Sequence, residues 1–267
     1  MLPGGIRFQD SLRRDYEFRP LTGEVEMGLA EAVARARDLP GQVTLALQAA
    51  LANVGGRLPD AGVIDGLSVG DRQFLMTRLA SVLGMGQVWL TASCRHCGES
   101  FDFPLNYEQL PVKPAGNGFP DAHISTDQGM LTLRVPNGMD QRAVLGIADL
   151  QLARQTLAKR CVSAWEGGDL SRLELDAGQV AAIEAALESV APEIATEVMA
   201  PCPECGASNR VSIDPYLCLG RVSQDLFADI HRLASHYHWS EAEILAMPRW
   251  RRQRYLALID RSRGMMQ

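Results

Sequence analysis

The sequence lacks several features that would place it in a common class of protein. None of its apolar runs approaches the ~18–20 residues that a membrane-spanning helix needs, so we expect no membrane segment. Its first 18 residues have no apolar core, and we expect no secretory signal. Basic residues are in the minority, 26 against 32 acidic ones, and the net charge of −6 argues against a non-specific nucleic-acid binder.

Catalytic motifs are missing as well. The sequence contains no Gly-x-Ser-x-Gly, no phosphate-binding loop and no Gly-x-Gly-x-x-Gly. We therefore expect a protein that is not an enzyme and that has no small-molecule substrate. In other respects the composition is that of a globular protein, with 46% apolar and 22% charged residues, and 267 residues suffice for one large domain or two small ones.

Two Cys-x-x-Cys-Gly motifs are the clearest chemical signal. The first contains Cys94 and Cys97, and the second contains Cys202 and Cys205. In a zinc knuckle the backbone turns sharply after the second thiolate, and glycine accepts the positive φ of that turn. Two knuckles supply the four sulfurs of a closed tetrahedral site, so we predict one structural Zn²⁺ per chain and no other cofactor.

The gap between the two motifs leaves other interpretations open. Cys97 and Cys202 are 105 positions apart, whereas a compact zinc ribbon has roughly 15–20 intervening residues. Either a subdomain is inserted between the knuckles, or each pair acts separately, as metal-free thiols or as a redox Cys-x-x-Cys. Apolar, strand-like segments flank both pairs, which favours hairpins over the helix start of a redox motif.

An internal duplication accompanies the two motifs. Residues 67–105 and 175–213 align without gaps, and ten of the 39 positions are identical. The cysteines and their glycine set this register, but the other seven identities exceed the two or so that chance would give at ~6% per position. Upstream, Thr22-Gly23 falls opposite Asn137-Gly138, each at a predicted helix N-cap.

The predicted fold is therefore α+β. Tandem duplicated helix/β-hairpin halves are bridged by a zinc-ribbon-like four-cysteine site, and a C-terminal helical tail follows. We predict these boundaries: 1–14 N-terminal leader, 15–112 first half, 113–129 linker rich in proline and glycine, 130–219 second half, and 220–267 helical tail.

The tail has no counterpart in the first half of the sequence. It contains a capping box at Ser240–Glu243 and a cluster of arginines in a chain that is acidic overall. A basic patch steers an acidic partner, and aromatic residues dominate interface hot spots. The expected partner-binding residues are Trp239, Trp250, Arg251, Arg252 and Tyr255, although the tail could instead pack on the chain's own core.

Several short motifs stand out in the tail and near the N-terminus: Arg19–Glu24, Val69–Leu75, Asp229–Ala234, Tyr237–Leu245, Pro248, Arg251–Arg252 and Tyr255–Leu256. Together they resemble one known family, the baseplate hub assembly proteins of T-even-like phages and of phage-derived contractile injection systems. The resemblance implies a non-enzymatic component or assembly factor of the baseplate, with other baseplate, hub or spike proteins as partners, and allows a place in the assembled tail particle. Because we expect neither a secretory signal nor a membrane segment, we expect the protein in the cytoplasm of the producing cell.

A zinc-ribbon module that binds nucleic acid or accompanies transcription is the alternative interpretation. It predicts basic residues on both knuckle loops. The first loop holds Arg95 and His96, but the second holds Pro203 and Glu204. That mixture suits a structural zinc better than a nucleic-acid contact.

Overall fold

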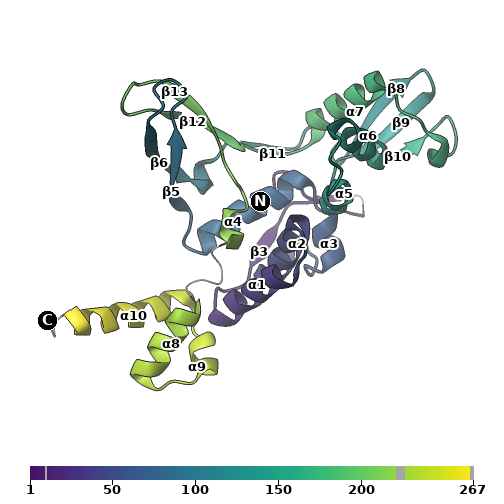
Figure 1. The fold of residues 1–267 in the computed structure, drawn as a ribbon. Helices are drawn as coiled ribbons and strands as arrows, with labels where there is room; N and C mark the ends of the chain where they lie inside the picture. Colours follow the sequence, from purple (N-terminus) through teal and green to yellow (C-terminus); the bar gives the residue numbers. More distant parts are fainter. Residues whose placement is uncertain (10, 221–225, 265–267) are drawn as a thin grey trace.

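A computed structural model describes residues 1–9, 11–220 and 226–264 of the chain. Within these residues the buried hydrophobic side chains form three separate cores. The central body has core residues within 2–110 and 194–219, the second body within 119–190, and the tail within 226–259. Figure 1 shows the central body between the other two, with two β-hairpins rising from it. The fold is a mixture of helices and small antiparallel sheets.

The central body combines four helices with five two-stranded antiparallel sheets, which pair β1 with β2, β3 with β4, β5 with β6, β7 with β11 and β12 with β13. Its elements are β1 (Ile6–Phe8), β2 (Ser11–Arg13), β3 (Tyr16–Phe18), α1 (Gly23–Arg35), α2 (Leu39–Ala50), β4 (Leu51–Val54), α3 (Ala61–Gly66), α4 (Val69–Val82), β5 (Gln87–Ser93), β6 (Ser100–Asn106), η1 (Tyr107–Gln109), β7 (Val112–Lys113), β11 (Glu193–Ile194), β12 (Glu197–Pro201), β13 (Ser208–Ser212) and η3 (Leu217–Gly220).

The second body carries the one three-stranded sheet among the described residues, in the order β10-β9-β8. Its strand β8 lies within the segment 113–129 that the sequence assigns to a linker, and pairs with β9 from Asp121 to Thr126. The elements are β8 (Asp121–Thr126), β9 (Gly129–Arg134), α5 (Gly138–Val144), α6 (Leu150–Cys161), β10 (Val162–Trp165), η2 (Leu170–Arg172) and α7 (Ala177–Val190).

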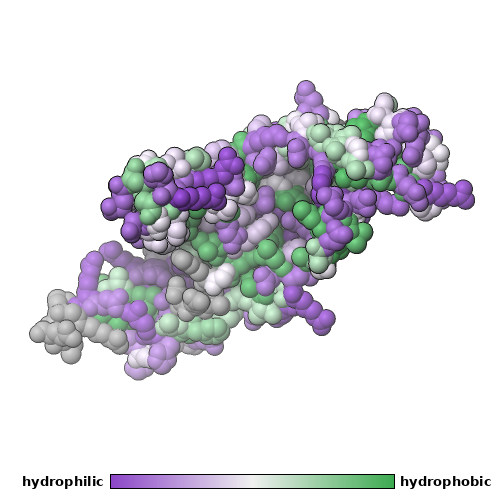
Figure 2. Space-filling model, turned by 45° about the horizontal axis from the view of Figure 1, so that its top comes forward, coloured by the Kyte–Doolittle hydropathy of each residue, from purple (hydrophilic) through white to green (hydrophobic). Residues whose placement is uncertain are grey.

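The two cysteine hairpins lie together on the central body, although one follows α7 of the second body. In β5 and β6 alternate residues face inward, as the period of two predicts for a half-buried sheet. Ala200 of β12 and Ile213, just after β13, are buried in the same core as Phe101 and Phe103 of β6. The second hairpin therefore packs with the first hairpin and not with the core of the second body. In Figure 2 hydrophilic residues dominate the hairpin lobe, and apolar surface shows over the middle of the molecule.

The order of elements is similar in the two halves. In the first half the paired strands β3 and β4 come before and after α1 and α2 in the sequence, and α4 then leads to the hairpin β5–β6. In the second half paired strands β9 and β10 enclose α5 and α6, and α7 leads through β11 to the hairpin β12–β13. Thr22 and Asn137 are the N-caps of α1 and α5, as predicted from the sequence.

The tail forms three helices, α8 (Leu226–Tyr237), α9 (Glu241–Leu245) and α10 (Arg249–Gly264). The predicted capping box is present at the start of α9, where Ser240 and Glu243 bond reciprocally. Met27 of α1 packs against the tail core, and α10 extends from this contact away from the central body (Figure 1). In the described part of the chain, none of the helices combines the length and apolar character needed to cross a membrane.

The N-terminus of α4 ties several segments of the central body together and also contacts the second body, where the Val69 N–H donates to the Pro136 carbonyl at 3.1 Å. The Asp71 carboxylate accepts hydrogen bonds from the backbone N–H groups of Gly4 and Gly5, at 2.8 and 3.0 Å. The buried Arg72 guanidinium donates to the Pro40 and Ile64 carbonyl oxygens, at 2.7 and 3.0 Å. Two charged side chains inside the molecule thus tie the N-terminal segment, α2 and α3 to one helix end.

Gly70→Ala is expected to destabilise this junction. A Cβ atom at Gly70 would lie 2.0 Å from the carbonyl oxygen of Pro192, so the backbone of one body would have to shift. Overpacking of this kind typically costs about 1–3 kcal/mol. Gly66→Ala at the end of α3 is the matched control, because its Cβ would meet nothing within 4 Å. Thermal unfolding of both variants measures the difference, and equal midpoints would contradict the close approach.

Candidate metal centre

Four cysteines from the two hairpins meet at one point. The sulfurs of Cys94, Cys97, Cys202 and Cys205 all lie within 4.8 Å of one another. Cys94 Sγ is 3.6 Å from Cys205 Sγ, and Cys97 Sγ is 3.8 Å from Cys202 Sγ. A disulfide would require about 2.05 Å, and the four thiols are free. Sulfurs bound to one tetrahedral zinc at about 2.3 Å would lie about 3.8 Å apart, so the cluster fits a single metal ion.

The two cysteine turns have the same backbone geometry. The Cys94 carbonyl accepts from the Gly98 N–H at 3.0 Å, and the Cys202 carbonyl accepts from the Gly206 N–H at 2.9 Å. Gly98 and Gly206 have φ of +82° and +72°, in the left-handed region that favours glycine. The predicted reason for a glycine after each Cys-x-x-Cys is therefore confirmed.

A buried asparagine holds the two turns together. The Asn209 side chain donates from Nδ2 to the Cys94 sulfur at 3.6 Å and to the Ala207 carbonyl at 2.9 Å. Its Oδ1 accepts from the Arg95 backbone N–H at 3.0 Å. Such outer contacts orient the ligands of a metal site. The sequence gives no signal for this residue, because Phe101 stands at the aligned position of the first half.

The surroundings favour ionisation of the Cys94 thiol and disfavour that of the Cys97 thiol. Backbone N–H groups of Cys97 and His96 lower the pKa of Cys94 to about 6. The Glu99 N–H lowers the pKa of Cys97, but burial and the three neighbouring sulfurs outweigh it and raise that pKa to about 12. Thiolates this close repel one another, so all four can ionise only around a cation.

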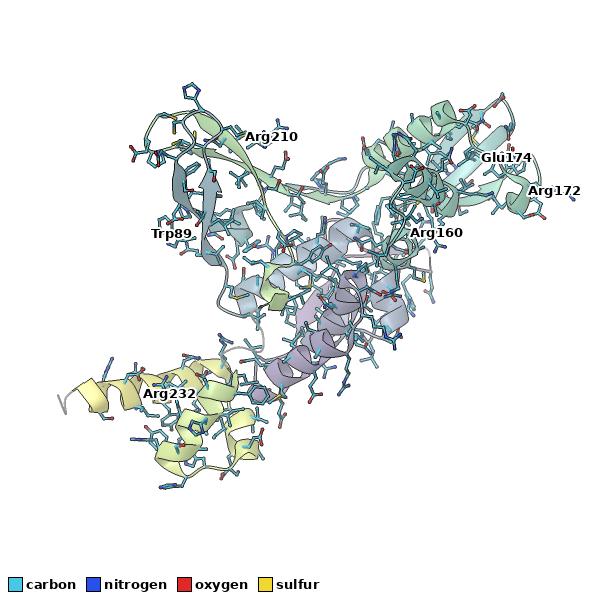
Figure 3. All side chains as sticks on the ribbon, viewed as in Figure 1. Trp89, Arg160, Arg172, Glu174, Arg210 and Arg232 are labelled. Atoms are coloured by element: carbon cyan, nitrogen blue, oxygen red, sulfur yellow. The ribbon has the colours of Figure 1, made fainter. Side chains whose placement is uncertain are left out.

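The geometry also separates a metal site from a redox site. The closest sulfur contacts cross from one hairpin to the other, and both Cys-x-x-Cys motifs lie in hairpin turns, whereas a redox pair lies at a helix start. Four protein sulfurs would complete the tetrahedral shell of a bound metal ion. Figure 3 shows the hairpins side by side, with Trp89 and Arg210 on them at a distance from the labelled residues of the second body.

The remaining two cysteines do not join this cluster. Cys161 is buried in the second body, and burial raises the pKa of its thiol to about 12. Cys218 is buried in the central body, where burial likewise raises the thiol pKa to about 12. Both therefore behave as small apolar side chains, as the sequence indicates.

The five tail residues expected to bind a partner have different surroundings. Trp239 and Tyr255 pack on each other, with ring centroids 4.8 Å apart, and both pack against the tail core. Arg252 is fully buried and bonds to Glu26 of α1 at 2.5 Å, so its guanidinium is not available at the surface. Trp250 is 72% exposed and Arg251 is exposed, which leaves these two on the outside of the described tail.

Two arginines have a structural position that the sequence did not predict, and one of them, Arg252, was expected to bind a partner. Arg72 and Arg252 are both fully buried, and in both the Nε atom has no hydrogen-bond partner among the described residues. Arginine is mostly exposed in proteins, so its position in a sequence gives little indication of burial. The sequence offers only an indirect indication of these buried arginines, the glycines at positions 23 and 138. A Cβ atom at Gly23 would lie 2.9 Å from a guanidinium nitrogen of Arg252, and one at Gly138 would lie 2.6 Å from a guanidinium nitrogen of Arg72.

Comparison with known proteins identifies a family. The family described as T4 bacteriophage base plate protein matches residues 6–216, which include the second body, both cysteine hairpins and most of the central body. No curated protein and no solved structure gives a significant match.

Proposed function

Because the chain belongs to the family of T4 bacteriophage base plate proteins, we propose that it is a non-enzymatic component or assembly factor of the baseplate in a phage-like contractile tail or injection system. The family match over residues 6–216 carries this proposal. The protein acts in the cytoplasm of the producing cell, where it contacts other baseplate, hub or spike proteins. A closed four-cysteine cluster in place of an open catalytic centre agrees with a structural role.

The four cysteines bind one structural Zn²⁺ per chain in this proposal. Four sulfur donors gathered within 4.8 Å of one another suit zinc among common cellular metals. The metal neutralises the thiolates and clamps two hairpins that are more than a hundred residues apart in the sequence. The zinc holds the second hairpin, which follows the second body in the sequence, against the central body.

A tandem duplication accounts for the way in which the two hairpins meet. The sequence alignment of 67–105 with 175–213 and the shared order of strands and helices support it. In this proposal residues 15–112 and 130–219 are the two halves, 1–14 precede them, 113–129 connect them and 220–267 follow. The zinc site is then formed from the same hairpin of each half, as in a zinc ribbon divided between two repeats.

The experiment that tests the baseplate role is co-expression of the tagged chain with the other baseplate proteins of its own tail. We expect the full chain to co-purify with at least one of them on size exclusion. A truncated chain of residues 1–220 is expected to remain folded and to lose this association, because the tail is the proposed docking element. A full chain that elutes alone would contradict the baseplate role. A truncated chain that keeps its partners would contradict the docking role of the tail.

A further inference from the structure

The tail meets the central body in the same way as the central body meets the second body. In the first contact the N-terminus of α10 lies on that of α1, where the Arg249 N–H donates to the Leu21 carbonyl at 2.9 Å and Pro248 forms a β-bridge with Thr22. The buried Arg252 covers Gly23.

In the second contact the N-terminus of α4 lies on that of α5. The Val69 N–H donates to the Pro136 carbonyl at 3.1 Å, and Ser68 forms a β-bridge with Asn137. The buried Arg72 covers Gly138, as Arg252 covers Gly23. The two contacts thus share a backbone hydrogen bond, a bridge and an arginine over a glycine.

The sequence agrees with this equivalence once the structure indicates the register. Shifting 60–79 by 180 positions gives 240–259 without gaps, and Arg72 falls on Arg252. The helix N-caps Asp60 and Ser240 coincide, and both accept from the backbone three residues on. The tail helices α9 and α10 are therefore counterparts of α3 and α4, although the sequence analysis finds none for the tail. Further matched pairs, identical or buried in both segments, are Ile64 with Ile244, Gln73 with Gln253, Leu67 with Met247, Met76 with Leu256, and Leu79 with Ile259.

The two equivalent helix ends differ in what covers them. At α4, an extended segment of this chain fills the space, with Gly4 and Gly5 bonded to Asp71 and with Pro192 against Gly70. At α10 the corresponding residues are Trp250 in place of Gly70 and Arg251 in place of Asp71. Both are exposed, and no segment of the described chain covers them as residues 2–5 cover Asp71.

Two hollows flank the exposed end of α10 and share Pro248. One, of about 560 Å³, lies between Trp250 and the end of α4 at Val82 and Gly84. The other, of about 420 Å³, is lined by Arg251 and Trp239. We call the two together the Trp250 groove.

We propose that the Trp250 groove binds an extended segment of a baseplate partner that carries a carboxylate beside an apolar side chain. This rests on the proposed function and names the surface and the chemistry of its partner. The equivalent surface at α4 shows that an extended segment fits such a helix end. Because Asp71 accepts from backbone N–H groups and Arg251 can only donate, the charge at this position is reversed and calls for an acceptor such as a carboxylate. Arg251 forms no ion pair within the described residues, and its guanidinium lies 5.8 Å from the Tyr255 ring centroid.

The test is co-purification of the full chain with the baseplate proteins expressed beside it, with two charge-reversed variants. Arg251→Glu is expected to weaken the association roughly tenfold or more, as loss of a central arginine does at interfaces. Arg261→Glu is the matched control, because it makes the same charge change on the exposed surface of α10, about 15 Å further along the helix. Trp250→Ala is compared in the same way with Trp89→Ala, since Trp89 is 70% exposed on β5.

The outcomes separate this inference from the proposed function. If Arg251→Glu and Arg261→Glu weaken the association equally, the partner senses the general charge of the tail and the groove proposal fails. It fails also if Arg251→Glu and Trp250→Ala bind as the wild type does, while the baseplate role stands. If the wild-type chain binds none of the baseplate proteins, the proposed function itself fails.

Discussion

Cys202→Ser is expected to release the metal and to separate the two hairpins. The wild-type protein should contain about one zinc per chain, and the variant close to none, because three thiolates no longer complete the tetrahedral shell. Structural zinc contributes ~10–16 kcal/mol in zinc-finger peptides, which is comparable with the whole stability of a domain. Elemental analysis measures the metal, and hydrogen exchange measures the protection of β12 and β13.

The loss should spread beyond the hairpins. Ala200 and Ile213 from the second hairpin are buried in the same core as Phe101 and Leu75, so a loosened second hairpin exposes part of the central body. Cys161→Ala is the control, because this buried thiol lies in the second body and does not join the cluster. It should leave zinc at one per chain. Two zincs per chain, none in the wild type, or full zinc in Cys202→Ser would each contradict the shared site.

The four-cysteine cluster could be predicted because its chemistry depends on residue type and short-range spacing. A Cys-x-x-Cys-Gly motif specifies its own turn, and two such turns need only one ion between them. The starts of α1 and α5 also followed from local signals, the N-caps Thr22 and Asn137. Periodicity does not say which core a strand packs against, and only the structure shows that the second hairpin packs in the core of the central body.

The predicted linker and the tail also show that local sequence patterns do not reveal tertiary contacts. Proline and glycine between 113 and 129 predict turns, but β8 forms there because β9 offers an edge with which it can pair, and that edge is a tertiary feature. In the tail, arginines suggested a basic docking surface. The structure instead divides them, since Arg252 is buried against Glu26 whereas Arg251 remains exposed. Charge alone cannot indicate which arginine has a buried partner.

Arg252→Met is expected to detach the tail from α1 while the central and second bodies stay folded. Glu26 is only 3% exposed, and its carboxylate bonds to Arg252 at 2.5 Å and to Arg249 at 3.1 Å. Removing one member of a buried ion pair typically costs 3–5 kcal/mol. The cost here is expected at the lower end of that range, because Arg249 remains as a partner of the Glu26 charge. The Met247 carbonyl also loses the donor that bonds to it at 2.8 Å. Limited proteolysis and hydrogen exchange of α8–α10 measure the release.

Two comparisons make the result specific to the buried pair. Arg254→Met changes an exposed arginine of the same helix and should leave the tail protected. Glu26→Gln combined with Arg252→Met removes both charges and should recover part of the loss. Because Arg72 is the counterpart of Arg252, Arg72→Met should loosen the contact of α4 with α5 and leave the tail on α1. If Arg252→Met leaves α8–α10 as protected as in the wild type, the tail is held by its apolar contacts. Arg252 then does not stabilise the contact of the tail with α1, in spite of its equivalence to Arg72.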